Sequence, residues 1–238
     1  MKPSKRSPKT GARRQVSPPL KTPDVRFPDP SAQLSLADQI LGRLIQRVGP
    51  CQLKIRSRRS PFQALVQAVT HQQLNGTAAQ TILRRVLALF PGTAFPSPQQ
   101  LLAMPDERLR AAGLSRAKTA SLKDIAAKTI AGVIPDSRSI KSMTEAEILE
   151  RLTTVRGVGP WTVEMLLIFT LGRRDVLPAT DYGVRKGFAL TYGWKDLPSP
   201  KELLEHGEKW RPHRSTAAWY FWRALDLPVN AADSSKAR

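Results

Sequence analysis

The chain has 238 residues, and 38 Lys and Arg against 19 Asp and Glu give it a formal net charge of +19. This charge predicts a polyanionic partner, for which nucleic acid is the leading candidate. The single cysteine, Cys51, excludes an intrachain disulfide, a four-cysteine iron–sulfur cluster and a cysteine-rich zinc site. One thiol, no signal peptide and no apolar run of ~20 residues predict a cytosolic protein outside the membrane.

Both ends of the chain are expected to lie outside the folded part. Residues 1–30 are basic and proline-rich and predict a disordered arm, and residues 229–238 predict a flexible tail. The arm carries +6 of the net charge, for which a solubilising tail is at least as good an explanation as a DNA-binding arm. The other +13 belongs to the rest of the chain, where it is harder to explain as a tail.

The elements predicted after the arm are all helical. Leu36, Ile40, Leu44 and Val48 are four residues apart and predict a helix over 34–48, and Ser60-Pro61 starts the next helix. Further helices are expected at 77–90, 97–104, 105–113, 115–132, 144–155, 160–172, 182–192, 201–210 and 212–227. No segment alternates cleanly enough to be a strand. The sequence therefore predicts an all-α domain over residues 31–228, with two lobes packed over a central cleft.

The most informative segment is a helical hairpin at about residues 148–171. Gly157-Val158-Gly159 separates two helices, and Pro160 is the first residue of the second one. Two glycines let backbone N–H groups approach a ligand, and the helix N-terminus adds a partial positive charge, which together make a phosphate site. On its own, however, this segment is better explained as an ordinary turn between two helices.

Three further segments change this interpretation of the hairpin. VLPATD ends at Asp181, twenty residues after Trp161; HQQLN lies at 71–75; and WRPHRSTAAWYFW lies at 210–222. With GLSRAKT at 113–119, these segments and the hairpin resemble the helix–hairpin–helix DNA glycosylase superfamily over residues 36–227. The resemblance is strongest to the 3-methyladenine DNA glycosylase II family, in its compact form without an N-terminal β-domain.

The resemblance implies hydrolysis of the bond between a damaged base and deoxyribose, with Asp181 as the catalytic carboxylate. Taken alone, Asp181 is better placed as the N-cap of the following helix, and the two roles are compatible. Bifunctional relatives carry a Schiff-base lysine where this chain has Trp161, so a monofunctional enzyme is expected. The family's pocket positions correspond to Trp161, Tyr182 and Trp222, whose rings would bind a cationic alkylated purine. Trp210 and Trp219 are expected in the core.

The remaining family positions concern DNA contact. Gly157, Val158 and Gly159 would bind the backbone, and Gln72 and Gln73 lie in the turn that fills the gap left by the flipped nucleotide. For Gln72, a structural role in the turn is equally open. The carbonyls of Thr153, Val155 and Val158 correspond to a sodium or potassium site, and no other cofactor is expected. The implied partner is double-stranded DNA with alkylated bases, bound by a monomer, in a bacterial nucleoid or a eukaryotic nucleus.

Three other functions remain open from the sequence. The chain could be a bifunctional glycosylase/lyase for another damaged base, or a helix–hairpin–helix module that binds DNA without catalysis. An RNA-associated basic protein fits the charge but leaves the ordered motifs unexplained. His71 and His213 are expected to be helix residues rather than ligands, and Arg214 could contact a phosphate or form an internal ion pair.

Overall fold

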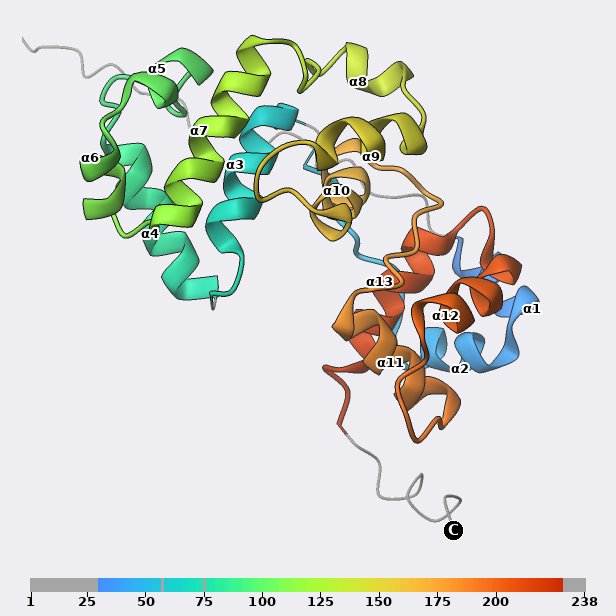
Figure 1. The fold of residues 1–238 in the computed structure, drawn as a ribbon. Coiled ribbons are helices and arrows are strands. Elements are labelled where there is room, and N and C mark those ends of the chain that lie inside the picture. The colour runs from blue at the N-terminus through green and yellow to red at the C-terminus, as the bar shows by residue number, and fades with distance from the viewer. Residues whose placement is uncertain (1–29, 57, 75, 229–238) are drawn as a thin grey trace, which may run out of the picture.

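The computed structural model describes residues 30–56, 58–74 and 76–228, and this part of the chain contains no β-strand. Its helices form two lobes joined at an angle (Figure 1). The all-α, two-lobed architecture predicted from the sequence is therefore confirmed. The arm predicted for residues 1–30 and the tail predicted for 229–238 lie outside the described residues, except for Pro30.

The first lobe is built from the middle of the chain. Its elements are α3 (Pro61–His71), α4 (Gly76–Ala88), α5 (Pro98–Ala103), α6 (Asp106–Ala111), α7 (Arg116–Ile130), α8 (Ser139–Ser142), α9 (Glu145–Thr153), α10 (Pro160–Leu166) and the π-helical turn η1 (Leu167–Leu171). Helix α7 is the longest of them and packs against both α3 and α5. Helix α10 packs on α3 and α9, which places the hairpin at the inner side of this lobe (Figure 1).

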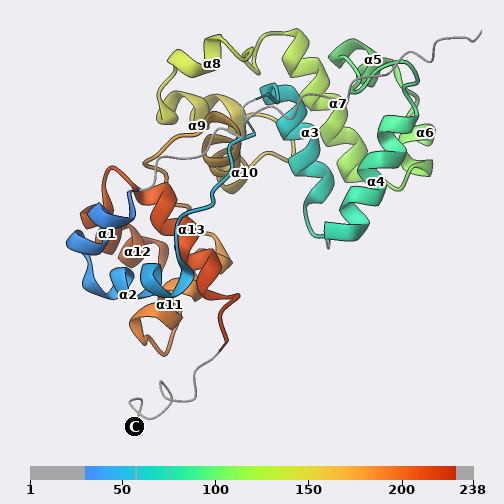
Figure 2. The same cartoon turned by 180° about the vertical axis from the view of Figure 1, so that it is seen from behind.

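The second lobe combines the two ends of the described chain. Its elements are α1 (Ser31–Ala37), α2 (Gln39–Val48), α11 (Tyr182–Tyr192), α12 (Pro200–His206), the 3₁₀ turn η2 (Gly207–Trp210) and α13 (Arg214–Ala224). Helix α13 packs against α2 and α11, so segments far apart in the sequence share one core (Figure 2). The chain thus leaves the second lobe after α2 and returns to it at α11.

Most helices begin at the residues that the sequence predicts. Ser60 and Thr144 form complete capping boxes with Gln63 and Glu147, and Ser115 accepts a hydrogen bond from the N–H of Lys118. These caps satisfy N–H groups that have no partner inside the helix, which is why short polar side chains mark the helix starts.

One expected helix is wrong. The segment 34–48 is not continuous, because Asp38 adopts an extended backbone between α1 and α2 and accepts hydrogen bonds from the N–H groups of Ile40 and Leu41. Leu36, one of the four residues whose spacing predicted that helix, is 87% exposed. The apolar periodicity continues through Asp38, but the helix does not, because the side chain of Asp38 caps α2 and starts a new helix there.

The second lobe has an aromatic core. Trp210, Tyr220, Phe188 and Phe221 are fully buried, and the ring of Phe188 contacts those of Trp210 and Phe221. The core position predicted for Trp210 is therefore confirmed, while Trp219 is only partly buried against that core. This packing holds α11 and α13 together, and these two helices carry Asp181 and Trp222.

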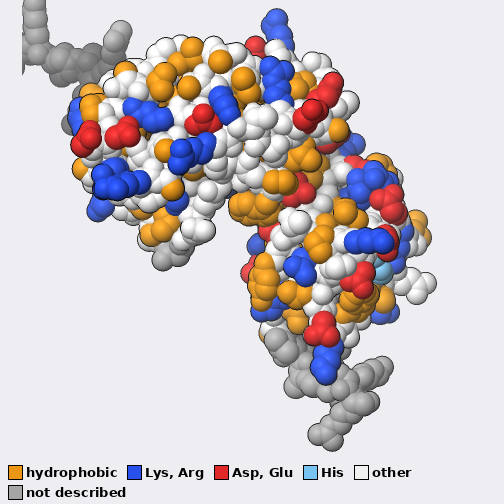
Figure 3. Space-filling model, in the orientation of Figure 1, with side chains coloured by type: hydrophobic (Ala, Val, Ile, Leu, Met, Phe, Trp, Pro, Cys, Tyr) orange, Lys and Arg blue, Asp and Glu red, His pale blue; other side chains and the backbone are white. Residues whose placement is uncertain are grey.

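The surface is hollowed between the two lobes (Figure 3). Blue Lys and Arg side chains lie on both lobes in this view, interspersed with acidic ones. No helix among the described residues is long and apolar enough to cross a membrane.

Candidate active site

Asp181 is the centre of the site, and its carboxylate accepts three N–H groups. Oδ1 accepts from the backbone N–H of Val184 at 2.8 Å and from Trp222 Nε1 at 2.9 Å. Oδ2 accepts from Trp161 Nε1 at 2.6 Å. These donors come from α11, α13 and α10, so helices of both lobes fix the carboxylate in one orientation.

The N-cap role expected for Asp181 is confirmed by the bond from Val184, and it leaves Oδ2 available to Trp161. Gly183 makes this arrangement possible, because a Cβ there would lie 2.9 Å from Trp222 Cδ1 and 3.1 Å from Asp181 Oδ1. A side chain at this position would push the indole of Trp222 off the carboxylate. The glycine in the sequence DYG is therefore part of the site.

The loop that leads to Asp181 is anchored to the start of α13. Arg214 is buried and binds Asp175 through Nε at 2.7 Å and Nη2 at 3.0 Å. Ser215 Oγ accepts from the N–H of Val176 at 3.0 Å and donates to the carbonyl of Arg173 at 2.8 Å. Of the two roles left open for Arg214, the structure shows the internal ion pair. Arg214 and Ser215 of the PHRS segment together hold the loop in position.

The three predicted pocket aromatics differ in their surroundings. Trp161 is 40% exposed, and Trp222 is half-buried and stacked on Phe169 with 5.6 Å between ring centroids. Tyr182 is 62% exposed, and Lys186 Nζ lies 5.8 Å from its ring centroid. The structure therefore brings Trp161 and Trp222 together at Asp181, whereas Tyr182 follows Asp181 in the chain with most of its side chain in solvent.

Glu164 is a second carboxyl near the site that the sequence analysis missed. Burial, with a contribution from the negative charge of Asp181, raises the pKa of Glu164 to about 7. Its Oε2 is buried and has no hydrogen-bond partner among the described residues. In the sequence, Glu164 is the one charged residue in the mostly apolar run WTVEMLLIFTL. Nothing in this pattern indicates a function for it.

The hairpin turn between α9 and α10 is held by α7. Gly157 has a φ of +76°, and a Cβ there would lie 2.5 Å from Ser121 Oγ. One turn further along α7, Asp124 Oδ2 accepts from the N–H of Arg156 at 2.7 Å. Gly159 caps α10 in an extended conformation, and a Cβ at this position would meet no atom within 4 Å. Gly157 is therefore required for packing, while the face at Gly159 is open.

Gln72 links the end of α3 to this hairpin. Its Nε2 donates to the carbonyl of Gly157 at 2.9 Å and to Thr162 Oγ1 at 3.2 Å. Of the two roles left open for Gln72, these bonds support the structural one. Gln73 is exposed and has a φ of +56°, a backbone angle that residues other than glycine seldom adopt.

Lys118 holds the turn that contains Gln73. Its Nζ donates to the carbonyls of Thr70 at 2.8 Å and Gln72 at 2.7 Å, at the C-terminus of α3. Burial lowers the pKa of Lys118, so the ammonium depends on these carbonyls for compensation. The lysine of the GLSRAKT segment thus positions the turn and is not a free surface charge.

The carbonyls predicted for a monovalent cation lie in the hairpin. That of Val155 accepts from the N–H of Val158 at 3.0 Å, and the carbonyl of Thr154 binds the ammonium of Lys128. The cation site stays a prediction. No group of His, Cys, Asp or Glu side chains among the described residues could hold a metal ion. His71 lies within α3, as expected, whereas His213 directly precedes α13 and is not part of the helix.

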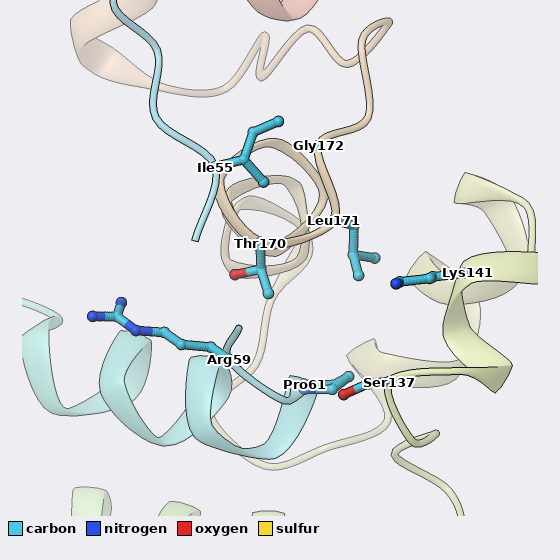
Figure 4. A pocket seen from close by; sticks show the side chains of 8 residues that line it. All are labelled: Ile55, Arg59, Pro61, Ser137, Lys141, Thr170, Leu171 and Gly172. Carbon is cyan, nitrogen blue, oxygen red and sulfur yellow. The ribbon is translucent and has the colours of Figure 1, made fainter. Parts of the chain in front are cut away.

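A cavity of about 190 Å³ lies outside this site, between the start of α3, α8 and the end of η1 (Figure 4). Ser137 and Lys141 line one side, and Thr170 and Gly172 line another. In Figure 4 the side chain of Lys141 extends toward Leu171, whereas the guanidinium of Arg59 points away from the other labelled residues. The cavity includes neither Asp181 nor its indole partners.

Comparisons with known proteins agree with this geometry. Residues 66–213 match the family described as "HhH-GPD superfamily base excision DNA repair protein". The chain belongs to the HhH-GPD superfamily. This is the family predicted from the hairpin, the VLPATD segment and the WRPHRS segment, and that prediction is confirmed.

Individual HhH-GPD relatives are similar over most of the chain. DNA-3-methyladenine glycosylase 1 of Schizosaccharomyces pombe is 38% identical over 82% of this chain and 86% of the relative. The alkylbase DNA glycosidase-like protein mag2 of the same yeast is 31% identical over 82% of this chain and 92% of the relative. The resemblance to 3-methyladenine DNA glycosylases predicted from the sequence is therefore confirmed.

Solved HhH-GPD structures have the same fold. The S. pombe 3-methyladenine DNA glycosylase Mag1 in complex with abasic DNA has a TM-score of 0.75 at 38% identity, covering 83% of this chain and 96% of that chain. The DNA-3-methyladenine glycosidase of Bacillus halodurans has a TM-score of 0.74 at 33% identity, covering 84% and 92%. Coverage this high of both partners is consistent with the compact form expected from the sequence.

Proposed function

We propose that the chain is a monofunctional DNA glycosylase that hydrolyses the N-glycosidic bond of alkylated purines, such as 3-methyladenine, in double-stranded DNA. The observation that carries the proposal is the carboxylate of Asp181, which accepts N–H groups from Trp161 and Trp222 beside the hairpin. Relatives named as 3-methyladenine glycosylases, at up to 38% identity, give it further support.

Asp181 would act as a fixed negative charge next to the sugar. Cleavage of the bond passes through an oxocarbenium-like transition state, which a preorganised carboxylate stabilises. The same carboxylate can orient the attacking water and accept its proton. Because its three donors already hold it in place, little reorganisation is needed as charge develops on the sugar.

The indole rings would bind the damaged base. An N3- or N7-alkylated purine is cationic, and the face of an aromatic ring stabilises a cation by about 0.5–2 kcal/mol. The exposed part of Trp161 and the ring of Trp222 supply such faces beside Asp181, and Tyr182 adds a third at the rim. A cationic base is already a good leaving group, so this chemistry needs no strong general acid.

The absence of lyase activity follows from Trp161. An indole cannot attack the sugar as an amine does, and its N–H is engaged with Asp181. We therefore expect base release without strand cleavage. The alternative, a bifunctional enzyme, would need a lysine at this position.

DNA would be held by the hairpin and the turn after α3. Gly157, Val158 and Gly159 would contact a phosphate, and exposed Gln73 would fill the gap left by the extruded nucleotide. The carbonyls of Thr153, Val155 and Val158 are the place proposed for a sodium or potassium ion. We propose that a monomer acts on the duplex, in the nucleoid of a bacterium or the nucleus of a eukaryote.

Base release from methylated duplex DNA, followed by chromatography, tests this function. We expect the purified chain to release 3-methyladenine and to form no covalent adduct when borohydride is added. A trapped adduct would show that the enzyme is bifunctional. Binding of the duplex without release of any base would leave the chain as a non-catalytic DNA-binding protein.

A further inference from the structure

Glu164 lies one helical turn beyond Trp161 on α10, and residues three apart share a face of a helix. Its Oε2 is buried without a hydrogen-bond partner among the described residues. Asp181, which Trp161 binds directly, is close enough for its negative charge to act on Glu164. A second carboxyl therefore lies on the face of α10 that also carries the indole bound to Asp181.

The charged groups on the elements around α10 are engaged elsewhere or, like Glu150 of α9, exposed to solvent. On α9, Glu147 caps its own helix, Arg151 binds the carbonyls of Gly132 and Val133, and Glu145 pairs with Arg173 at 3.5 Å. On α3, the ring of His71 bonds to the carbonyl of Gln67. The sequence of η1, LIFTL, contains no titratable side chain. Among the described residues, Asp181 is the charged group that shifts the pKa of Glu164.

A buried carboxyl oxygen without a hydrogen-bond partner, such as Oε2 of Glu164, is unfavourable for folding. Burying a polar atom without a hydrogen bond costs free energy that an apolar side chain at the same position would not cost. The fold therefore gives no reason for a glutamate here. A positively charged group placed in the pocket would supply the missing compensation.

We propose that Glu164 is a specificity-determining residue, which gives the base pocket a second carboxylate and so favours cationic bases over neutral ones. The inference rests on the glycosylase function proposed above and adds a cause for its choice of substrate. The two carboxyl groups then have different roles. Asp181 stabilises the charge on the sugar, and Glu164 interacts with the charge of the base.

The selection would arise from the protonation of Glu164. In the empty pocket, burial and Asp181 raise its pKa to about 7, so near neutral pH much of it is uncharged. A cationic base lowers that pKa, and the resulting carboxylate attracts the base. A neutral base provides no such charge and leaves the carboxyl protonated. The pocket thus responds to the charge of the base in addition to its shape.

The substitution Glu164→Gln tests the proposal, because it keeps the shape and removes the negative charge. The kcat/KM for base release is measured on duplexes with 7-methylguanine, which is cationic, and with hypoxanthine, which is neutral. We expect a loss of about tenfold or more on 7-methylguanine and a much smaller change on hypoxanthine. Glu150→Gln, at an exposed position of α9, is the matched control and is expected to change neither rate.

The pH dependence of the wild-type protein gives an independent readout. We expect the ratio of kcat/KM for 3-methyladenine, whose cation does not titrate near neutral pH, over hypoxanthine to rise through about pH 7, as Glu164 ionises, and to be flat in Glu164→Gln. Asp181 acts on both substrates, so its ionisation cancels in the ratio. Glu164→Asp, which keeps a carboxylate, should retain part of the preference, and thermal melting checks that each variant is folded.

Equal losses on both substrates in Glu164→Gln, or a wild-type ratio that does not change with pH, would overturn the role of Glu164 while leaving the glycosylase function intact. If Glu164→Gln does not fold, the wild-type ratio alone decides. A wild-type protein that releases neither base would instead reject the proposed function, and this inference with it.

Discussion

Asp181 caps a helix with one carboxylate oxygen, and we propose that the same carboxylate acts in catalysis. One oxygen caps α11 through Val184, and the other accepts the indole N–H of Trp161. Because capping fixes the side chain in one rotamer, it also aims the carboxylate. The cap and the proposed catalytic role, which the sequence analysis treats as compatible, can therefore be served by the same side chain.

The two glycines of the hairpin should respond differently to substitution. Gly157→Ala places a Cβ at positive φ against Ser121, and we expect it to lower the free energy of unfolding by roughly 1–3 kcal/mol. Gly159→Ala meets no atom within 4 Å, and we expect it to fold normally but bind DNA more weakly, because the methyl group obstructs a phosphate. Urea unfolding and fluorescence anisotropy with labelled duplex measure the two effects. Equal stability of the two variants would refute the packing role of Gly157.

At the scale of single residues, the sequence predicted which side chains meet at the candidate site, but it did not predict the pKa shifts there. Asp181, Trp161 and Trp222 could be predicted because each lies in a spaced motif, and the fold brings them together. Glu164 could not, because its raised pKa depends on burial and on a neighbour seventeen residues away. Gln72 was ambiguous for the same reason, since its partner Gly157 is distant in the sequence.

Among the elements, α7 holds the turn after α3 and the hairpin in place, and this is the side that we propose binds DNA. Residues on one face of it reach the turn after α3 and the hairpin: Lys118, Ser121, Asp124 and Lys128. Its lysines contribute to the +13 carried by the chain after residue 30, yet they bind backbone carbonyls at the ends of other helices. Such contacts depend on tertiary packing and cannot be found from spacing alone.

Removal of the Lys118 ammonium tests this role of α7. Lys118→Met keeps the aliphatic chain and leaves the carbonyls of Thr70 and Gln72 without their donor, so we expect a stability loss of about 1–3 kcal/mol. Base release should fall as well, because the turn with Gln73 loses its anchor. Arg116→Met, at an exposed position of the same helix, is the control. Similar activity and melting temperature in the two variants would mean that α7 does not hold the turn.

At the scale of the whole molecule, part of the +19 charge is structural. Arg214 pairs with Asp175, and Lys118, Lys123 and Lys128 bind carbonyls. We propose that the charge remaining on the surface holds the duplex, whereas the chemistry is assigned to the carboxylate of Asp181. Net charge therefore predicted the class of partner, while the reaction depended on local geometry.

The stability of the second lobe should depend on pH through Asp38. Burial would raise the pKa of this carboxyl, but hydrogen bonds from Tyr192, Trp210 and the N–H of Leu41 outweigh it and lower the pKa from 3.8 to about 2. The resulting stability, roughly 2 kcal/mol, is present above pH 3.8 and is lost as the pH falls through about 2. Urea unfolding between pH 6 and pH 2 measures this loss.

The variant Asp38→Asn should already lack that contribution at pH 6. It should lose less stability than the wild type on acidification, whereas Asp196→Asn, at an exposed position, should follow the wild type. If Asp38→Asn matched the wild type at every pH, the carboxylate would not join α2 to α11 and η2 as its hydrogen bonds indicate.

The most direct test of the central claim is single-turnover release of 3-methyladenine by Asp181→Asn. Asparagine is a good N-cap, so α11 should stay folded and DNA affinity should change little. The negative charge beside the sugar is lost, and we expect the rate to fall by about 100-fold or more. Release by folded Asp181→Asn at the wild-type rate would contradict the account.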